Sequence, residues 1–270
     1  MHGLPRLLML APIVMGALAA GGLDLPLRSR VEAFKGSGQW QEVRFVAPLP
    51  PGQTAIVICD MWDKHWCAGA TRRVAALAER MAPVIAAARA HGIQIIHAPS
   101  ETMGFYRDWP QRQRMLHIAR VEPPAPLGIT DPPLPIDDSG GGCDTGDAQY
   151  KAWSREIATL SVGDGDVISD DGAEIYSFLR QHGIQNVLIM GVHVNMCVLN
   201  RSFAIKQMTN WGIRCVLVRD LTDSMYDPKD RPYVSHDRGT ELVIEHIEKY
   251  WCPSATSADL MKALHRRGTR

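Results

Sequence analysis

The stretch Thr54-Ala-Ile-Val-Ile-Cys-Asp60 is a continuous apolar run that ends in a carboxylate. A short run of this kind, without polar alternation, is typical of a strand that is buried on both faces of a parallel sheet. Apolar residues then recur at helical spacing over 71–91, and Gly92 follows as a stop signal. Residues 93–98 are then predicted to form a second strand. This order predicts one unit of strand, helix and parallel strand.

The same order returns in the C-terminal half of the chain. We expect helices over 173–182, 195–211 and 239–250, and strands over 186–191 and 213–220. Strands that alternate with helices form parallel sheets with right-handed crossovers. The sequence therefore predicts an α/β protein with a three-layer Rossmann-like fold and a mainly parallel sheet of about six strands.

Length and composition indicate one main domain. The chain has 270 residues, of which 46% are hydrophobic, enough to bury a substantial core. We expect an N-terminal extension over 20–53 and a domain over 54–270 that carries a long insertion over 100–165. The insertion is rich in Pro, Gly and Asp, which is typical of a lid, a binding loop or a disordered segment.

The N-terminus has the pattern of a secretory signal peptide. Arg6 precedes an apolar run over 7–20 that contains the small-residue sequence Ala17-Leu18-Ala19. The run is shorter than the roughly 20 apolar residues that span a bilayer, which disfavours the alternative of a membrane anchor. We therefore predict a signal peptide over 1–19 and export to the periplasm or the cell exterior.

Charge and cysteine content limit the partners. The chain has 29 basic and 29 acidic residues and no block of Lys and Arg, so nucleic acid is not an expected partner. No two of the six cysteines form a Cys-x-x-Cys pair, and a chain of this length does not depend on disulfides. Their pairing stays open. The cysteines are Cys59, Cys67, Cys143, Cys197, Cys215 and Cys252.

Two reactive side chains are expected at the carboxyl ends of strands, where open parallel sheets bind ligands. Asp60 ends the first strand, and Cys197 follows the strand over 186–191 near the start of a predicted helix. Amide groups at a helix N-terminus favour a thiolate and lower the pKa of a cysteine there. From position alone, Cys197 is equally well explained as an inert buried thiol.

The segments 54–60, Gly191-Val-His-Val-Asn-Met-Cys-Val198 and Cys215-Val-Leu-Val-Arg-Asp220 together resemble the isochorismatase-like superfamily of cysteine hydrolases, which includes nicotinamidases and N-carbamoylsarcosine amidases. The resemblance covers most of 54–220. It implies that Cys197 is the nucleophile, that Asp60 is the general base, and that a small amide, urea or carbamate-type C–N bond is cleaved through a thioester. A non-catalytic small-molecule-binding or scaffold protein on the same fold is the alternative, because a fold does not fix an activity.

The resemblance also implies an oxyanion site. The backbone amides of Val194 and Cys197 would hold the oxyanion, after a non-proline cis peptide bond between His193 and Val194. It implies in addition a small-molecule substrate and a homo-oligomer.

One part of the family pattern is missing. The family's third catalytic residue is a lysine after the strand that corresponds here to 166–168, and this chain continues with Ser169 and Asp170. Either Lys64, Lys151 or Arg155 supplies the positive charge from elsewhere, or the domain has lost hydrolysis.

Further pocket candidates are Trp62, Asp63, His65, His97 and Asp170. The two tryptophans at 62 and 66 flank an acid and a histidine and favour a flat or cationic ligand. No cofactor is required by this interpretation. A divalent metal bound by Asp63, His65 and His97 is an alternative that the resemblance to nicotinamidases suggests, and histidines that pack or hydrogen-bond are the simpler explanation.

Overall fold

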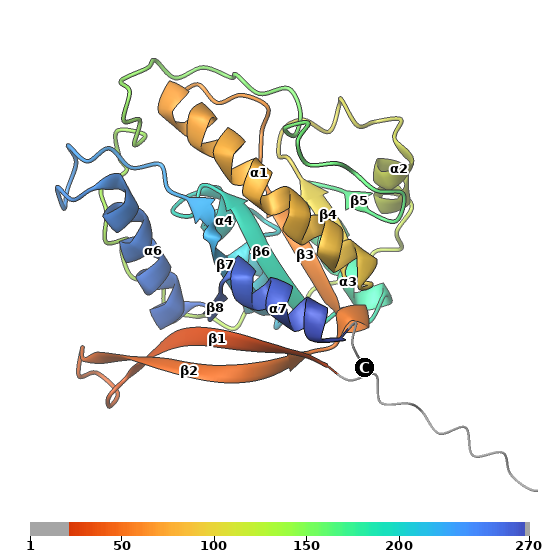
Figure 1. Cartoon of the computed structure of the whole chain (residues 1–270), viewed down its shortest axis with the longest axis horizontal. Helices are drawn as coiled ribbons and strands as arrows, with labels where there is room; N and C mark the ends of the chain where they lie inside the picture. Colours follow the sequence, from red (N-terminus) through yellow and green to blue (C-terminus); the bar gives the residue numbers. More distant parts are fainter. Residues whose placement is uncertain (1–21, 268–270) are drawn as a thin grey trace, which may run out of the picture.

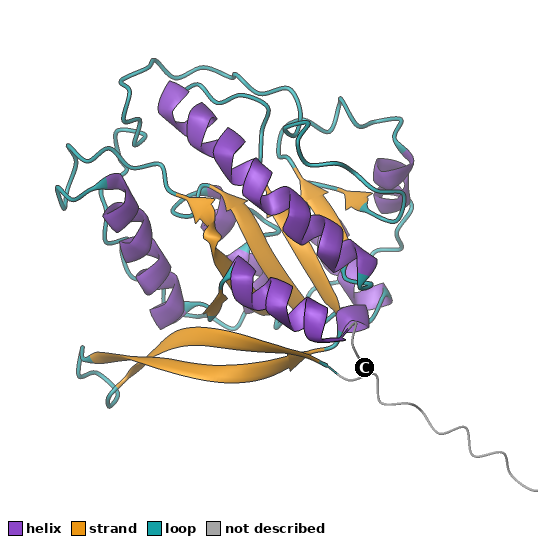
Figure 2. Cartoon of the chain, in the orientation of Figure 1, coloured by secondary structure: helices purple, strands orange, loops and turns teal. Residues whose placement is uncertain are grey.

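One mixed sheet of eight strands forms the centre of the computed structural model, which describes residues 22–267 (Figures 1 and 2). The strand order is β2-β1-β8-β7-β6-β3-β4-β5. The strands are β1 (Leu23–Glu32), β2 (Trp40–Leu49), β3 (Thr54–Cys59), β4 (Gln94–Ala98), β5 (Val167–Ile168), β6 (Asn186–Val192), β7 (Arg214–Asp223) and β8 (Ser254–Ala255).

Helices cover both faces of this sheet, as the three-layer prediction requires. They are α1 (Ala68–Ala90), α2 (Pro110–Leu116), α3 (Gly172–Gln181), α4 (Cys197–Asn200), α5 (Ile205–Asn210), α6 (His236–Tyr250) and α7 (Ser257–Arg267), with the 3-10 turn η1 (Pro51–Gln53) before β3. In Figure 1, α1 and α7 lie in front of the sheet. Apolar residues of α1 and α7 pack with Ile56 and Ile58 of β3, whereas those of α3 to α6 pack with Ala55 and Val57. Alternate residues of one strand thus face two different cores.

The α/β class and the mainly parallel sheet are confirmed, but the expected number of about six strands is wrong. Strands β3 to β8 are parallel, and the antiparallel hairpin β1–β2 joins the edge at β8. The hairpin comes from the segment 20–53, expected as an extension. Its buried side chains Leu23, Leu25 and Leu27 alternate with polar or exposed ones, the period of a half-buried strand.

The single helix expected over 195–211 is also wrong. The chain forms the one-turn helix α4, leaves helical geometry at Arg201 with ψ 154°, and resumes as α5. The start of α3 packs against this break: the amide of Gly172 donates to Oγ of Ser202 (3.0 Å), and a Cβ at Gly172 would lie 1.9 Å from the Ser202 carbonyl oxygen. The break therefore leaves Arg201 in an extended turn immediately after the first helical turn that Cys197 begins.

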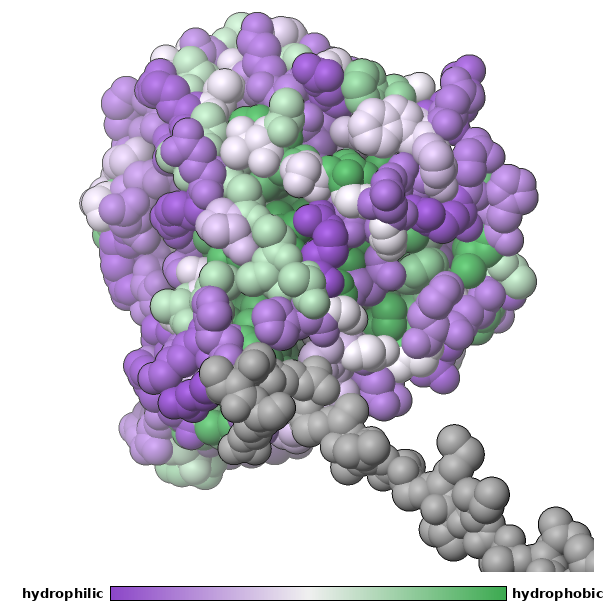
Figure 3. All heavy atoms as spheres, turned by 45° about the vertical axis from the view of Figure 1, so that its right-hand side comes forward, coloured by the Kyte–Doolittle hydropathy of each residue, from purple (hydrophilic) through white to green (hydrophobic). Residues whose placement is uncertain are grey.

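The insertion over 100–165 contains α2 and a long irregular path around the molecule (Figure 2). Backbone bonds hold it at separate points, for example from the amide of Leu127 to Asn210 (3.2 Å) and from that of Ile157 to Met61 (2.7 Å). On the face shown in Figure 3, hydrophilic side chains dominate the periphery and hydrophobic ones gather towards the middle. Within 22–267, no helix has both the length and the hydropathy of a membrane span. The predicted signal peptide over 1–19 lies outside the described residues.

Candidate active site

The predicted nucleophile and base meet where the strand order changes direction. From β3 the chain proceeds to β4 and β5 on one side, and β6, β7 and β8 follow on the other. Asp60 follows β3, Cys197 follows β6, and these strands are neighbours with Cys59 opposite Gly191. At Gly191 φ is 115°, and a Cβ there would lie 2.1 Å from the carbonyl oxygen of Cys59. A glycine is therefore needed for the two strands to approach this closely.

Asp60 is fully buried, and both oxygens of its carboxylate are held. The backbone amide of Ser100 donates to Oδ1 (2.7 Å), and Nε of Arg201 donates to Oδ2 (3.0 Å). Burial raises the pKa of Asp60 above its usual range, and the Arg201 charge opposes this shift. A carboxylate with a raised pKa is a stronger base than an ordinary aspartate.

The Cys197 thiol lies close enough to the Asp60 carboxylate for each group to affect the pKa of the other. Burial is the main cause that raises the pKa of Cys197, and the negative charge of Asp60 adds to it, although Arg201 acts in the opposite direction. This corrects the expectation of a lowered pKa at a helix N-terminus. Helix α4 has a single turn, so its few aligned peptide dipoles do not outweigh burial. Cys197 is thus a thiol at rest and needs a base to become a nucleophile.

Arg201 is a candidate functional residue that the sequence analysis did not identify. Its guanidinium pairs with Asp60 beside Cys197, and the carboxylate and thiol raise its pKa against the effect of burial. The positive charge stands four residues after the nucleophile rather than after β5. That spacing is one helical turn, which is the signal by which the sequence could have revealed it.

The cations proposed from the sequence lie elsewhere. Nζ of Lys151 contacts Glu101, with 3.1 Å to its carbonyl oxygen and 3.9 Å to its carboxylate. Lys64 lies over the ring of Tyr150, and Arg155 lies over that of Phe105. None of these contacts involves Asp60 or Cys197. Ser169, at the expected lysine position, donates its hydroxyl to Glu174 (2.5 Å).

The expected oxyanion site needs two corrections. The non-proline cis bond joins Val192 and His193, one residue before its predicted place between His193 and Val194. The amide of Val194 donates to the carbonyl oxygen of Asp223 (2.8 Å), so it is not available to a substrate. Of the two predicted donors, the backbone amide of Cys197 remains a candidate for binding an oxyanion.

A pocket of about 470 Å³ opens beside Cys197. Its wall combines the nucleophile segment with two residues of the insertion, Leu134 and Asp138. Asn195 joins the two parts, because its Nδ2 donates to Oδ2 of Asp138 (2.8 Å) and to the carbonyl oxygen of Met225 (3.0 Å). The other lining residues are Asn195, Met196, Cys197, Asn200 and Arg201.

Trp62 and His65 belong to an aromatic stack rather than to the lining of this pocket. The rings of Trp62 and Trp153 are parallel with centroids 4.2 Å apart, and His65 lies 5.9 Å from Trp153. Burial lowers the pKa of His65 to about 4, so it is neutral near pH 7. Nε1 of Trp62 donates to the carbonyl oxygen of Ser100 (3.1 Å), the residue that also holds Asp60. The stack thereby helps to hold Ser100, whose amide binds Asp60.

Asp63, His97 and Asp170 hold loops in place. Oxygens of Asp63 accept bonds from the amide and hydroxyl of Ser154, and Oδ2 of Asp170 accepts one from the amide of Glu101 (2.8 Å). Both ring nitrogens of His97 also contact carboxylates.

His97 lies between two carboxylates, with 2.6 Å from Nδ1 to Glu156 and 3.1 Å from Nε2 to Asp166. Although burial opposes ionisation, these neighbours raise the pKa of His97 to about 9. In the described part of the chain, the proposed metal ligands Asp63, His65 and His97 are not brought together. They do not fit the metal that the resemblance suggested.

No model of a known protein family matches the chain, and no curated protein does. Solved structures are similar, however. A cysteine hydrolase from Pseudomonas syringae pv. phaseolicola 1448A is 17% identical over 82% of this chain and 96% of its own, with a TM-score of 0.54. An isochorismatase from Pseudomonas putida KT2440 is 14% identical over 78% and 92%, with a TM-score of 0.49. The first comparison confirms the predicted resemblance at the level of the fold.

Proposed function

We propose that this chain is a cysteine hydrolase that cleaves a small amide, urea or carbamate-type C–N bond through a thioester on Cys197. The ion pair between Arg201 and Asp60 (3.0 Å) is the observation that carries the proposal. It provides the cation that the sequence lacks at the family's lysine position. A buried carboxylate that pairs with a cation and lies near a thiol is an arrangement suited to moving one proton.

Asp60 starts the reaction by accepting the proton of the Cys197 thiol as the sulfur attacks the carbonyl carbon. The tetrahedral intermediate carries a negative oxygen, towards which the amide of Cys197 donates. The C–N bond then breaks, and the departing nitrogen takes the proton from Asp60. The products of this half-reaction are an amine or ammonia and a thioester.

Hydrolysis of the thioester uses the same base. Asp60 accepts a proton from water, the hydroxide oxygen adds to the thioester carbon, and the C–S bond breaks. The Cys197 sulfur recovers the proton, and the acid leaves. Splitting the reaction into two acyl transfers avoids direct attack of water on the amide.

Arg201 keeps the buried carboxylate ionised between these steps. Without a neighbouring cation, burial would favour the protonated carboxyl, which cannot accept the thiol proton. Because the guanidinium is held against Oδ2 while the amide of Ser100 holds Oδ1, the carboxylate is also fixed in orientation. The absence of the family's lysine was the sequence feature that favoured a non-catalytic protein, and Arg201 removes that objection.

The pocket supports a small polar substrate. A volume of about 470 Å³ lies in the range of small-molecule sites. Asp138 and Asn200 provide hydrogen-bonding groups at its wall, while Leu134 and Met196 provide apolar surface. This mixture suits a compact amide or urea group on a partly apolar body.

The test is a panel of primary amides, ureas and N-carbamoyl amino acids, with release of ammonia as the readout. We expect turnover of at least one class by the parent protein and none by Cys197→Ala. Cys215→Ala is the matched control, because this cysteine lies in strand β7 and contacts neither Asp60 nor Arg201 in the described structure. Turnover by Cys197→Ala at the parent rate would exclude the thioester mechanism.

A further inference from the structure

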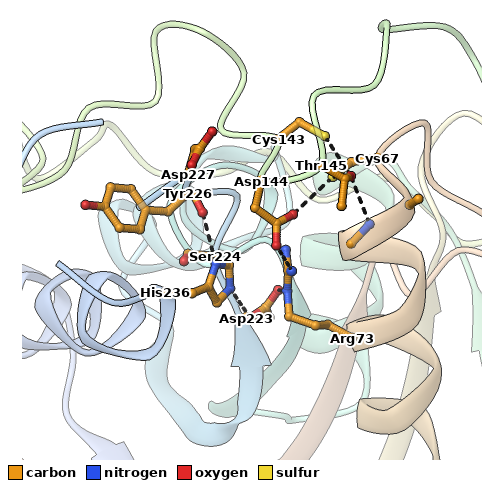
Figure 4. Close-up of polar contacts among 12 residues, drawn as sticks. Cys67, Arg73, Cys143, Asp144, Thr145, Asp223, Ser224, Tyr226, Asp227 and His236 are labelled. Atoms are coloured by element: carbon orange, nitrogen blue, oxygen red, sulfur yellow. Dashed lines mark hydrogen bonds and ion pairs between the residues drawn. The ribbon is translucent and has the colours of Figure 1, made fainter. Parts of the chain in front are cut away.

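Two thiols outside the active site face each other at the start of helix α1 (Figure 4). Cys67 is the residue before α1, and Cys143 comes from the insertion. Their sulfurs and a carboxylate oxygen of Asp144 all lie within 4.8 Å of one another. The hydroxyl of Thr145 lies 3.4 Å from both sulfurs. Residues far apart in the sequence thus place two sulfurs side by side.

The loop that carries Cys143 is docked on the first turn of α1. Oδ2 of Asp147 accepts a bond from the amide of Ala68 (2.8 Å), and Oγ1 of Thr145 accepts one from the amide of Gly69 (3.2 Å). These bonds satisfy amide groups that a helix leaves without a partner at its N-terminus. The spacing of the two thiols is therefore fixed by the backbone on both sides.

The two thiols differ in their readiness to ionise. Burial opposes ionisation of Cys143, but its polar contacts with Cys67 and Thr145 lower its pKa below the usual range. Cys143 is also partly exposed, so that a small molecule reaches it. Cys67 is buried, and burial raises its pKa. Its thiol donates to Oδ1 of Asp144 (3.4 Å).

We propose that Cys67 and Cys143 form a reversible disulfide by exchange with a small-molecule disulfide. Cys143 releases its proton to solvent, its thiolate attacks one sulfur of that molecule, the S–S bond of the small molecule breaks, and the thiolate that leaves takes up a proton. Cys67 then releases its proton to solvent and attacks the sulfur of Cys143. The second small thiolate leaves and takes up a proton. Two cysteine thiols are oxidised, and one small disulfide is reduced to two thiols.

The charges around the pair favour this chemistry over a bound metal ion. Nη1 of Arg73 lies 2.6 Å from Oδ2 of Asp144, and its Nε lies 2.9 Å from Oδ2 of Asp223 (Figure 4). A guanidinium on the carboxylate and the positive end of α1 both repel a cation. A disulfide carries no charge and is not opposed by either.

The disulfide would act on the wall of the Cys197 pocket. Asp138, which accepts a hydrogen bond from Asn195, lies on the same loop as Cys143 and is separated from it by Ser139 and the three glycines Gly140 to Gly142. The backbone of Gly142 touches the carbonyl of Met225, where a Cβ would lie 2.2 Å from the oxygen. Linking Cys143 to α1 therefore restrains the segment that forms one side of the pocket. Only this last consequence rests on the proposed function.

The experiment uses the full chain in buffers of oxidised and reduced glutathione, quenched with acid, alkylated and mapped by peptide mass. We expect one peptide pair joined through Cys67 and Cys143, lighter by two hydrogens, whose amount follows the glutathione ratio. It should be absent in Cys143→Ser and retained in Cys215→Ala. Circular dichroism of each variant confirms that it is folded.

Three results would overturn the proposal. One is that no joined peptide appears at any ratio, and another is that Cys143 carries only a glutathione adduct. The third is that one equivalent of Zn²⁺ stays bound through gel filtration and protects both thiols from alkylation, which would assign a metal site instead. None of these readouts uses turnover, so a failure here leaves the hydrolase proposal unaffected.

Discussion

Nε of Arg201 lies 3.0 Å from Oδ2 of Asp60, a buried carboxylate whose other oxygen accepts the amide of Ser100. The side chain of Arg201 is 31% exposed, whereas that of Asp60 is 0% exposed. The cation therefore stands between solvent and the base. It compensates the buried negative charge without being fully buried itself, which limits its own desolvation cost.

Replacing Arg201 tests its role as the cation of the site. We expect Arg201→Gln to lower kcat/KM by about 100-fold or more, because the charge that keeps Asp60 ionised is lost. Arg201→Lys should retain more activity, since it preserves the charge. The control is Lys151→Ala, whose side chain is 58% exposed and contacts Glu101. Equal losses in the Lys151 and Arg201 variants would assign the cation to Lys151.

The variant Asp60→Asn tests whether Asp60 acts as a base or only holds the structure of the site. The amide oxygen still accepts the bond from Ser100, so the fold should persist. Turnover should fall by roughly 10²–10⁴-fold because no base remains. Alkylation of Cys197 by iodoacetamide should also become slower, because burial still raises the pKa of this thiol and no base is left to accept its proton. If both rates stayed at the parent level, Asp60 would not be the base.

The sequence predicted the parts of the site that follow from strand ends. Asp60 and Cys197 could be placed because continuous apolar runs end just before them, and parallel strands end at a common edge. Arg201 has only its four-residue spacing from Cys197 as a signal, and its position in the fold depends on a helix break that the apolar pattern over 195–211 conceals. The break is a tertiary effect, caused by the close packing of α3 on Ser202. Periodicity does not record such a contact.

The pocket candidates Trp62, His65 and His97 do not line the pocket beside Cys197, for a related reason. Trp62, His65 and His97 lie close to Asp60 or β4 in the sequence, but their partners come from the insertion. Trp153 and Glu156 are distant in the chain, and nothing in an irregular segment indicates which side chain it will meet.

Gly191→Ala should be strongly destabilising. A Cβ there meets the carbonyl oxygen of Cys59 at 2.1 Å, in backbone that cannot move without disturbing β3 and β6. We expect the free energy of unfolding to fall by about 3 kcal/mol in urea titration. Gly212→Ala is the matched control, with φ 80° but no atom within 4 Å, and should cost about 1 kcal/mol. Similar losses for both would show that the strands can separate.

Stability should fall in alkaline solution through His97. Its pKa is raised from 6.5 to about 9 in the folded protein, so its contribution is full below pH 6.5 and disappears as the pH rises through 9. We expect a loss on the order of 2–3 kcal/mol over this window. His97→Gln should show a flatter dependence of stability on pH, because the titration of His97 is removed. Thiols and other groups titrate equally in both proteins and do not affect the comparison. Parallel profiles would mean that His97 is neutral in the fold.

The position of Arg201 makes the reactive segment separable from its scaffold. Cys197 and Arg201 are four residues apart: Cys197 begins the single turn of α4, and Arg201 follows that turn directly. Asp60 instead follows the neighbouring strand β3. A related sheet that already ends a strand in a buried aspartate would need to acquire only this one short stretch. Exchange of a single continuous piece of chain, rather than coordinated change at two strands, is then enough to transfer the chemistry.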